Sequence, residues 1–195
     1  MGTNPDASNN EKVYQRLRQH LDDLPGGFPA TEDGIELRIL RRLFTPTEAD
    51  LARHLTLIPE EARVIAHRAG LDPAEAMARL ETMANKGLIF RAFREDRPPR
   101  YQAAQFVVGI YEYQLNKMDE AFIQDVEAYW PTLFDPDVWQ AAPQIRTIPV
   151  HESISYTPEV MAYEQADHLI ADHDRIAVAP CVCRQEQKLA GDGCD

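Results

Sequence analysis

Apolar residues in the first part of the chain recur at helical spacing in several separate stretches. The first stretch places an apolar residue at every third or fourth position, at Val13, Leu17, Leu21 and Leu24. The Pro-Gly-Gly run at residues 25–27 then ends this predicted helix. A second stripe, made of Ile35, Ile39, Leu40 and Leu43, predicts the next helix. The chain therefore begins with a lead helix and continues into a compact run of helices.

Two further helices are predicted by the residues at their N-termini. Residues 45–48, Thr-Pro-Thr-Glu, supply an N-cap threonine, a proline at the first helical position and a capping-box glutamate. Residues 72–75, Asp-Pro-Ala-Glu, repeat this arrangement before an apolar face that closes at Gly87. Between them, a helix is predicted to begin at Pro59 and to end near Gly70.

The period of the pattern changes after Gly87. Residues 88–94 read as a strand, residues 95–99 as a turn and residues 100–103 as a returning strand. Helices followed by a β-hairpin are typical of a winged helix. We therefore expect residues 1–30 to form a polar tail and lead helix, and residues 31–105 to form a winged-helix domain.

The second part of the chain, residues 106–195, predicts mixed structure. One long amphipathic helix is expected over residues 106–130, interrupted by Pro131. After a proline-bearing connector, residues 145–150 read as a strand, residues 158–171 as a helix and residues 176–179 as a buried strand. The fold class expected for the whole chain is therefore α+β, mostly helical.

Composition and charge limit the classes of function. The chain has 195 residues, of which 44% are hydrophobic, so it is long enough to bury a core. Its net charge is −12; residues 1–105 carry 15 basic and 16 acidic side chains, and residues 106–195 carry 5 and 16. The acidic second part would repel phosphate backbones, so nucleic acid is not expected to bind, and it would favour a basic protein partner. A solvated acidic surface with no specific partner is the alternative.

Neither a secretory signal nor a membrane anchor is indicated. The first ten residues lack a basic stretch followed by an apolar one, and no apolar run in the sequence is long enough to span a bilayer. We expect a cytoplasmic protein. The sequence also lacks the common nucleotide-binding and hydrolase motifs, so nucleotide binding and common hydrolase chemistry have no basis in it.

All three cysteines, Cys181, Cys183 and Cys194, lie within the last fifteen residues. Two thiolates two residues apart can leave one turn toward a common centre, and Gly191 and Gly193 free the backbone to bring a third sulfur to it. Soft sulfur ligands select an iron–sulfur cluster or zinc. The alternative is that the three cysteines are reduced residues of the core. A disulfide is disfavoured by the odd number and by the short Cys181–Cys183 spacing.

Three segments resemble a family of iron–sulfur electron-transfer proteins of anaerobic bacteria. They are residues 106–112 (Phe-Val-Val-Gly-Ile-Tyr-Glu), 176–184 (Ile-Ala-Val-Ala-Pro-Cys-Val-Cys-Arg) and 193–195 (Gly-Cys-Asp). In that family a winged-helix-like region precedes a C-x-C-R…C segment, and ferredoxin-type 4Fe-4S modules follow. The resemblance implies that Cys181, Cys183 and Cys194 bind a 4Fe-4S cluster and that Arg184 is the family's arginine.

The sequence departs from the family pattern at its end. The family has a further cysteine shortly after the position of Cys194, whereas this sequence ends at Asp195 and so looks truncated before the fourth cysteine. A non-cysteine ligand is the other possibility. The nearest candidates are His151, His168, His173 and Asp195.

Two roles are open for Arg184. Its charge would raise the potential of a cluster by favouring the reduced, more negative form. Alternatively, Arg184 is a surface residue paired with Glu186 or Asp192.

The cysteine segment and the resemblance together favour an electron-transfer protein that works with a redox partner. A DNA-binding regulator with a cysteine sensor is the main alternative, based on four arginines of the predicted hairpin, Arg91, Arg94, Arg97 and Arg100. A structural zinc protein is the third interpretation, and it differs from the first only in its metal.

Overall fold

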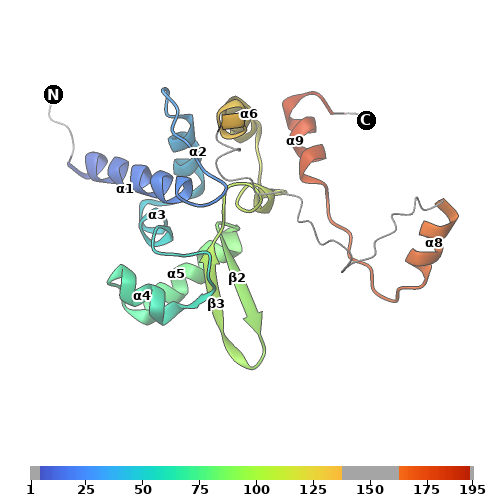
Figure 1. Ribbon diagram of the computed structural model, residues 1–195, viewed down its shortest axis with the longest axis horizontal. Helices are drawn as coiled ribbons and strands as arrows, with labels where there is room; N and C mark the ends of the chain where they lie inside the picture. The colour runs from blue at the N-terminus through green and yellow to red at the C-terminus, as the bar shows by residue number, and fades with distance from the viewer. Residues whose placement is uncertain (1–4, 138–162, 194–195) are drawn as a thin grey trace, which may run out of the picture.

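The computed structural model describes residues 5–137 and 163–193 (Figure 1). Helices dominate the described residues, and a small three-stranded antiparallel sheet accompanies them. The predicted class, α+β and mostly helical, is confirmed. In the part of the chain that the structure describes, no helix is both long and apolar enough to cross a membrane.

The first three helices pack against one another through their apolar faces. They are α1 (Pro5–Asp22), α2 (Ile35–Leu43) and α3 (Pro46–Ala52). Leu17 and Ile39 are fully buried, as their places in the helical stripes predict. The capping box of α3 is also confirmed: the Thr45 N–H donates to Glu48 Oε2 at 2.9 Å, and the Glu48 N–H donates to Thr45 Oγ1 at 3.3 Å.

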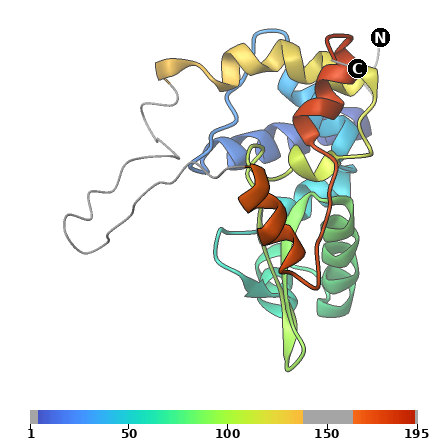
Figure 2. The ribbon, with the colours of Figure 1, turned by 90° about the vertical axis from the view of Figure 1, so that its right-hand side faces the viewer.

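A helix pair and a hairpin follow. The elements are β1 (Glu60–Glu61), α4 (Ala62–Ala69), α5 (Pro73–Lys86), β2 (Ile89–Arg94) and β3 (Arg97–Ala103). The strands lie in the order β1-β3-β2, and both pairs are antiparallel. From α3 to β3 the chain thus has the helices and the hairpin that the winged-helix prediction requires, and the hairpin projects from the body in both views (Figures 1 and 2).

Gly87 connects α5 to the hairpin at a point where only glycine fits. Its φ is 80°, in the left-handed region, and it caps α5. A Cβ at this position would lie 2.4 Å from the Cβ of Tyr113. The close approach holds the end of α5 against the segment that follows the hairpin.

The prediction of a single long helix over residues 106–130 is wrong for the first half of that range. Residues 105–119 form compact turns, with a bridge between Gln105 and Gly109 and a 3₁₀ helix, η1 (Glu112–Gln114). A Cβ at Gly109 would lie 2.4 Å from the Gln105 carbonyl oxygen, so the chain folds back tightly here. The turns bury Phe106, Ile110 and Tyr111 just as a helix would, which is why the apolar spacing misled the prediction.

The long helix begins instead at α6 (Glu120–Leu133), after the N-cap residue Asp119. The Phe122 N–H donates to Asp119 Oδ1 at 2.8 Å. Pro131 does not end the helix as predicted, because α6 continues to Leu133. Its partner is α2, to which it is joined by the ion pair between Arg38 and Asp125.

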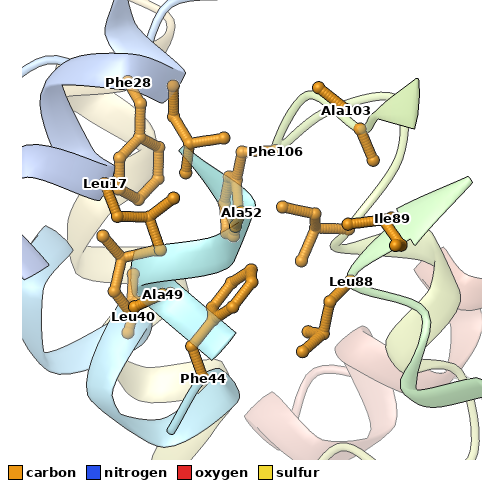
Figure 3. Packing of buried hydrophobic residues seen from close by; sticks show 14 of the residues in the cluster. Leu17, Phe28, Leu40, Phe44, Ala49, Ala52, Leu88, Ile89, Ala103 and Phe106 are labelled. Carbon is orange, nitrogen blue, oxygen red and sulfur yellow. The ribbon is translucent and has the colours of Figure 1, made fainter. Parts of the chain in front are cut away.

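One apolar cluster holds these elements together. Phe28 and Phe106 have ring centroids 5.0 Å apart, and Tyr129 of α6 lies 5.0 Å from Phe28. Figure 3 shows Phe106 between helical residues such as Leu17 and hairpin residues such as Ile89. Residues before and after position 105 thus contribute to the same core, and the division into residues 1–30, 31–105 and 106–195 stays a prediction.

The last described elements are α8 (Tyr163–Ala171) and α9 (Val182–Ala190). The helix predicted over residues 158–171 is seen from Tyr163 onward; its first residues and the strand predicted at 145–150 lie outside the described residues. The prediction of a buried strand over residues 176–179 is wrong, because this segment has no strand structure and Val178 is 92% exposed. No described strand lies beside it to complete its hydrogen bonds.

Candidate cysteine site

The exposed face of α9 carries two of the three cysteines. Cys181 is the N-cap residue, and Cys183 lies in the first turn; both thiols are free and exposed. Val182, Leu189 and Ala190 lie on the other face and pack against the core. Helical spacing places Cys183, three residues before Glu186 and seven before Ala190, at the edge of this packed face, while its thiol is still exposed.

Two hydrogen bonds anchor the inner face of α9. The indole Nε1–H of Trp130, in α6, donates to Glu186 Oε1 at 2.9 Å. The backbone N–H of Asn116 donates to Gln185 Oε1 at 2.7 Å. α9 lies beside α6 in both views (Figures 1 and 2), and the cysteine-bearing helix is thus attached to the main body.

The Glu186 carboxylate also influences a buried phenol. The hydroxyl of Tyr111 is buried next to this carboxylate. Burial first, and the nearby Glu186 carboxylate second, raise the pKa of Tyr111 far above its ordinary value. The anchoring face of α9 is therefore built around one partly buried carboxylate.

The two thiols differ in their tendency to ionise. The pKa of Cys181 is lowered, chiefly by the backbone N–H groups of Arg184 and Cys183 in the first turn of α9. The pKa of Cys183 is raised by partial burial and by the negative charges of Cys181 and Glu186. Each thiol thus affects the protonation of the other, so the two sulfurs are close neighbours at the start of the helix.

Arg184 lies on the exposed face beside the thiols. It forms no ion pair with Glu186 or Asp192 in the described residues, although all three residues are described. Its positive charge contributes to the lowered pKa of Cys181. Of the two roles predicted from sequence, the ion pair is not seen in the described residues, and the effect on the potential of a cluster stays a prediction.

The chain reverses direction after α9. Gly191 has a φ of 89° and caps the helix, and the Asp192 N–H donates to the Gln187 carbonyl at 2.9 Å. Gly193 then packs against the helix, where a Cβ would lie 2.9 Å from the Cα of Lys188. Lys188 is five residues beyond Cys183, about 8 Å along the helix axis. The two glycines thus turn the chain back along the helix, and the predicted approach of Cys194 to the other thiols lies outside the described residues.

The other residues predicted as possible metal ligands are only partly covered by the described structure. Cys194, Asp195 and His151 lie outside the described residues. His168 and His173 are described and exposed, and His173 Nδ1 is 2.7 Å from the Leu169 carbonyl oxygen. Within residues 5–137 and 163–193, no group of three or more histidine, cysteine, aspartate or glutamate side chains is arranged to hold a metal ion. The described structure therefore brings Cys181 and Cys183 together and adds neither histidine to them.

Sequence reasoning did not identify the residues that anchor the site. Tyr111 was interpreted only as a member of an apolar stripe, Trp130 only as the end of the predicted helix, and Glu186 only as a partner for Arg184. A usable signal was present, because a tryptophan N–H or tyrosine O–H that becomes buried needs a polar partner. The sequence cannot show which of many acidic residues supplies it.

Comparison of this chain with protein-family models, with curated proteins and with solved structures finds no match. The function of the cysteine site is therefore inferred from its own residues and geometry.

Proposed function

We propose that this chain is an iron–sulfur cluster-binding electron-transfer protein, or the electron-transfer subunit of a larger enzyme. The observation that carries the proposal is the joint exposure of Cys181 and Cys183 at the first turn of a helix attached to the core. Sequence resemblance adds Cys194 as a third ligand and a 4Fe-4S cluster as the cofactor.

The chemistry of the described thiols fits such a cofactor. A cluster is held by thiolates, and the lowered pKa of Cys181 favours its thiolate form. The N–H groups of Arg184 and Cys183 stabilise negative charge on sulfur, as does the positive end of the helix dipole. When bound, the cluster would supply one-electron transfer, and Cys181, Cys183 and Cys194 would hold it.

The residues around the thiols have separate parts in this function. Trp130 and Glu186 fix the orientation of α9 through their 2.9 Å hydrogen bond, so that the thiols face outward. Arg184 places a positive charge next to the sulfurs and favours the reduced state of a bound cluster. The 16 acidic and 5 basic residues of positions 106–195 favour a basic redox partner.

Anaerobic reconstitution tests the proposal. The chain would be incubated with ferrous iron, sulfide and 2-mercaptoethanol, whose thiolate can occupy the fourth ligand position. Iron and acid-labile sulfide should then remain with the protein after desalting, in equal amounts, together with the visible sulfur-to-iron absorption. Cys183→Ser should lose both, because a hydroxyl is a hard ligand that replaces thiolate poorly.

A matched variant shows whether the effect is specific. Gln187→Ser introduces the same hydroxyl at another exposed position of α9 and should retain the iron and sulfide. Stoichiometric zinc without sulfide in the purified protein would instead identify a structural zinc site. Equal iron retention by the original chain and by Cys183→Ser would exclude Cys183 as a ligand.

A further inference from the structure

The β2–β3 hairpin carries three arginines on one of its faces. In the antiparallel register, Ala92 pairs with Arg100, and Arg94 pairs with Arg97. Cross-strand partners project from the same face of a sheet, as do residues two apart in one strand. Arg94, Arg97 and Arg100 therefore share the face of Ala92.

An irregularity in β3 creates this arrangement. Between the two pairs, Pro98 and Pro99 stand opposite the single residue Phe93, so β3 contains one extra residue. Without that residue, Arg94 would pair with Pro98, and Arg97 would project from the opposite face of the hairpin. The proline-bearing bulge thus gathers three positive charges that a regular hairpin would divide.

The side chains of Arg94, Arg97 and Arg100 line one surface hollow of about 160 Å³. Its lining consists of Pro59, Ala92, Arg94, Arg97, Pro98 and Arg100. Pro59, Ala92 and Pro98 make part of this lining apolar, and an ion pair next to apolar groups is stronger than one in open water. The hollow therefore combines cationic groups with a low-polarity floor.

Two of the three arginines lack the ion pair that a neighbouring arginine has. Arg91, on the other face of β2, forms an ion pair with Glu81 of α5. In the described residues, Arg94 and Arg100 form no ion pair, whereas Arg97 forms one of 3.6 Å with the largely exposed Asp96. Like charges at directly opposed positions destabilise a hairpin. A bound anion would remove this repulsion.

We propose that this hollow binds the carboxylate side chains of an acidic polypeptide segment. Guanidinium groups match carboxylates in shape and form paired hydrogen bonds with them. The apolar floor suits the carbon atoms of aspartate and glutamate side chains. The site is on the hairpin and involves none of the cysteines, so the proposal is independent of cluster binding.

The charges around the hairpin favour an acidic polypeptide over nucleic acid. In a winged helix, α5 would be the helix that approaches a DNA groove, but its Arg79 pairs with its own Glu75. Residues 31–105 as a whole carry 12 basic and 12 acidic side chains. Binding to a duplex depends on neutralising many phosphates, whereas a few carboxylates need only the three arginines of the hollow.

Fluorescence anisotropy with a labelled ten-residue glutamate peptide tests the proposal. The peptide should bind the intact chain, and binding should weaken as salt is raised from about 50 to 200 mM. The double variant Arg94→Gln/Arg100→Gln should bind roughly tenfold more weakly, since two exposed guanidinium–carboxylate contacts are lost. Both positions are exposed, so circular dichroism should show an unchanged fold.

The double variant Arg16→Gln/Arg175→Gln is the matched control. Arg16 and Arg175 are also exposed and without an ion pair in the described residues, and their replacement removes the same total charge. This control should change peptide binding less than about twofold. Equal losses in the two double variants, or no peptide binding at low salt, would overturn the proposal. Tighter binding of a labelled DNA duplex, lost in Arg94→Gln/Arg100→Gln, would make the hollow a nucleic-acid site and would also overturn it.

Discussion

The indole N–H of Trp130 donates a 2.9 Å hydrogen bond to the carboxylate of Glu186, across 56 positions of the sequence. Trp130 belongs to α6, and Glu186 lies in the middle of α9, one turn after Cys183. Together with the bond from the Asn116 N–H to Gln185 Oε1, this bond links the core to the helix that presents the cysteines. The environment of the thiols should therefore respond to changes at either residue.

Trp130→Phe is expected to loosen α9 while leaving the core folded. The variant removes the N–H donor and leaves a half-buried carboxylate without this partner, which should cost on the order of 1–2 kcal/mol of local stability. Hydrogen-exchange mass spectrometry of residues 182–190 would detect faster exchange. Tyr113→Phe, which removes the hydroxyl of an exposed aromatic residue, is the control and should leave exchange unchanged.

Cys181 is expected to react faster than Cys183 with iodoacetamide at pH 7.5. The Arg184 and Cys183 N–H groups lower the pKa of Cys181, whereas burial and the charges of Cys181 and Glu186 raise the pKa of Cys183. Because the thiolate is the nucleophile, we expect roughly a three- to tenfold difference in rate, measured by peptide mass spectrometry. Glu186→Gln should accelerate alkylation of Cys183, because it removes one of the charges that oppose ionisation.

Glu127→Gln provides the comparison for that variant. Glu127 is an exposed acidic residue of α6, and its replacement removes the same charge at a different position. It should leave both alkylation rates unchanged. Faster alkylation of Cys183 in both variants would show that net charge, and not Glu186, controls the thiol.

Stability should fall as the pH is lowered below about 6.5, the ordinary pKa of histidine. Burial lowers the pKa of His20 and of His54, so the unfolded chain binds more protons than the folded one in this window. Their contribution is complete above the unfolded pKa and is lost as the pH falls through the lower, folded values. Urea unfolding between pH 7.5 and 5.5 would measure the effect.

His20→Gln should reduce the pH dependence in that interval. His20 Nε2 is buried and has no hydrogen-bond partner in the described residues, so protonating it in the folded state is costly. His67→Gln, at an exposed position in the last turn of α4, serves as the control. The same slope of stability against pH in the original chain and in His20→Gln would contradict this assignment.

Phe106 is expected to be a major contributor to stability. It is 1% exposed and contacts Phe28, with ring centroids 5.0 Å apart. Phe106→Ala should destabilise the fold by about 3–5 kcal/mol, because it removes a large side chain and leaves a cavity. Phe93→Ala, at a hairpin position that is 70% exposed, should change stability by less than about 0.5 kcal/mol. Urea unfolding monitored by circular dichroism would compare the two variants, and similar losses would contradict the assigned core.

Local signals in the sequence were sufficient for the helices and the hairpin of the first part. The Thr45 and Asp72 caps and the glycine at position 87 act over one helical turn, so their physical effect can be read directly from neighbouring residues. The exposed position of Arg184 in α9 can also be read from the sequence, because a helix that starts beside Cys181 places Arg184 opposite the apolar residues Val182, Leu189 and Ala190.

Long-range contacts decided what these local signals left open. Val107, Ile110 and Tyr111 have helical spacing, yet the chain buries Ile110 and Tyr111 in turns, where Tyr111 packs against Phe106 and Gly109 permits a close approach to Gln105. Similarly, the apolar run at residues 176–179 favours a strand only if another strand lies beside it. The sequence by itself determined the helical elements and the cysteine-bearing segment. The pairing of Trp130 with Glu186 depends on tertiary packing, and the position of the three hairpin arginines on one face depends on strand register. No short stretch of sequence encodes either of these.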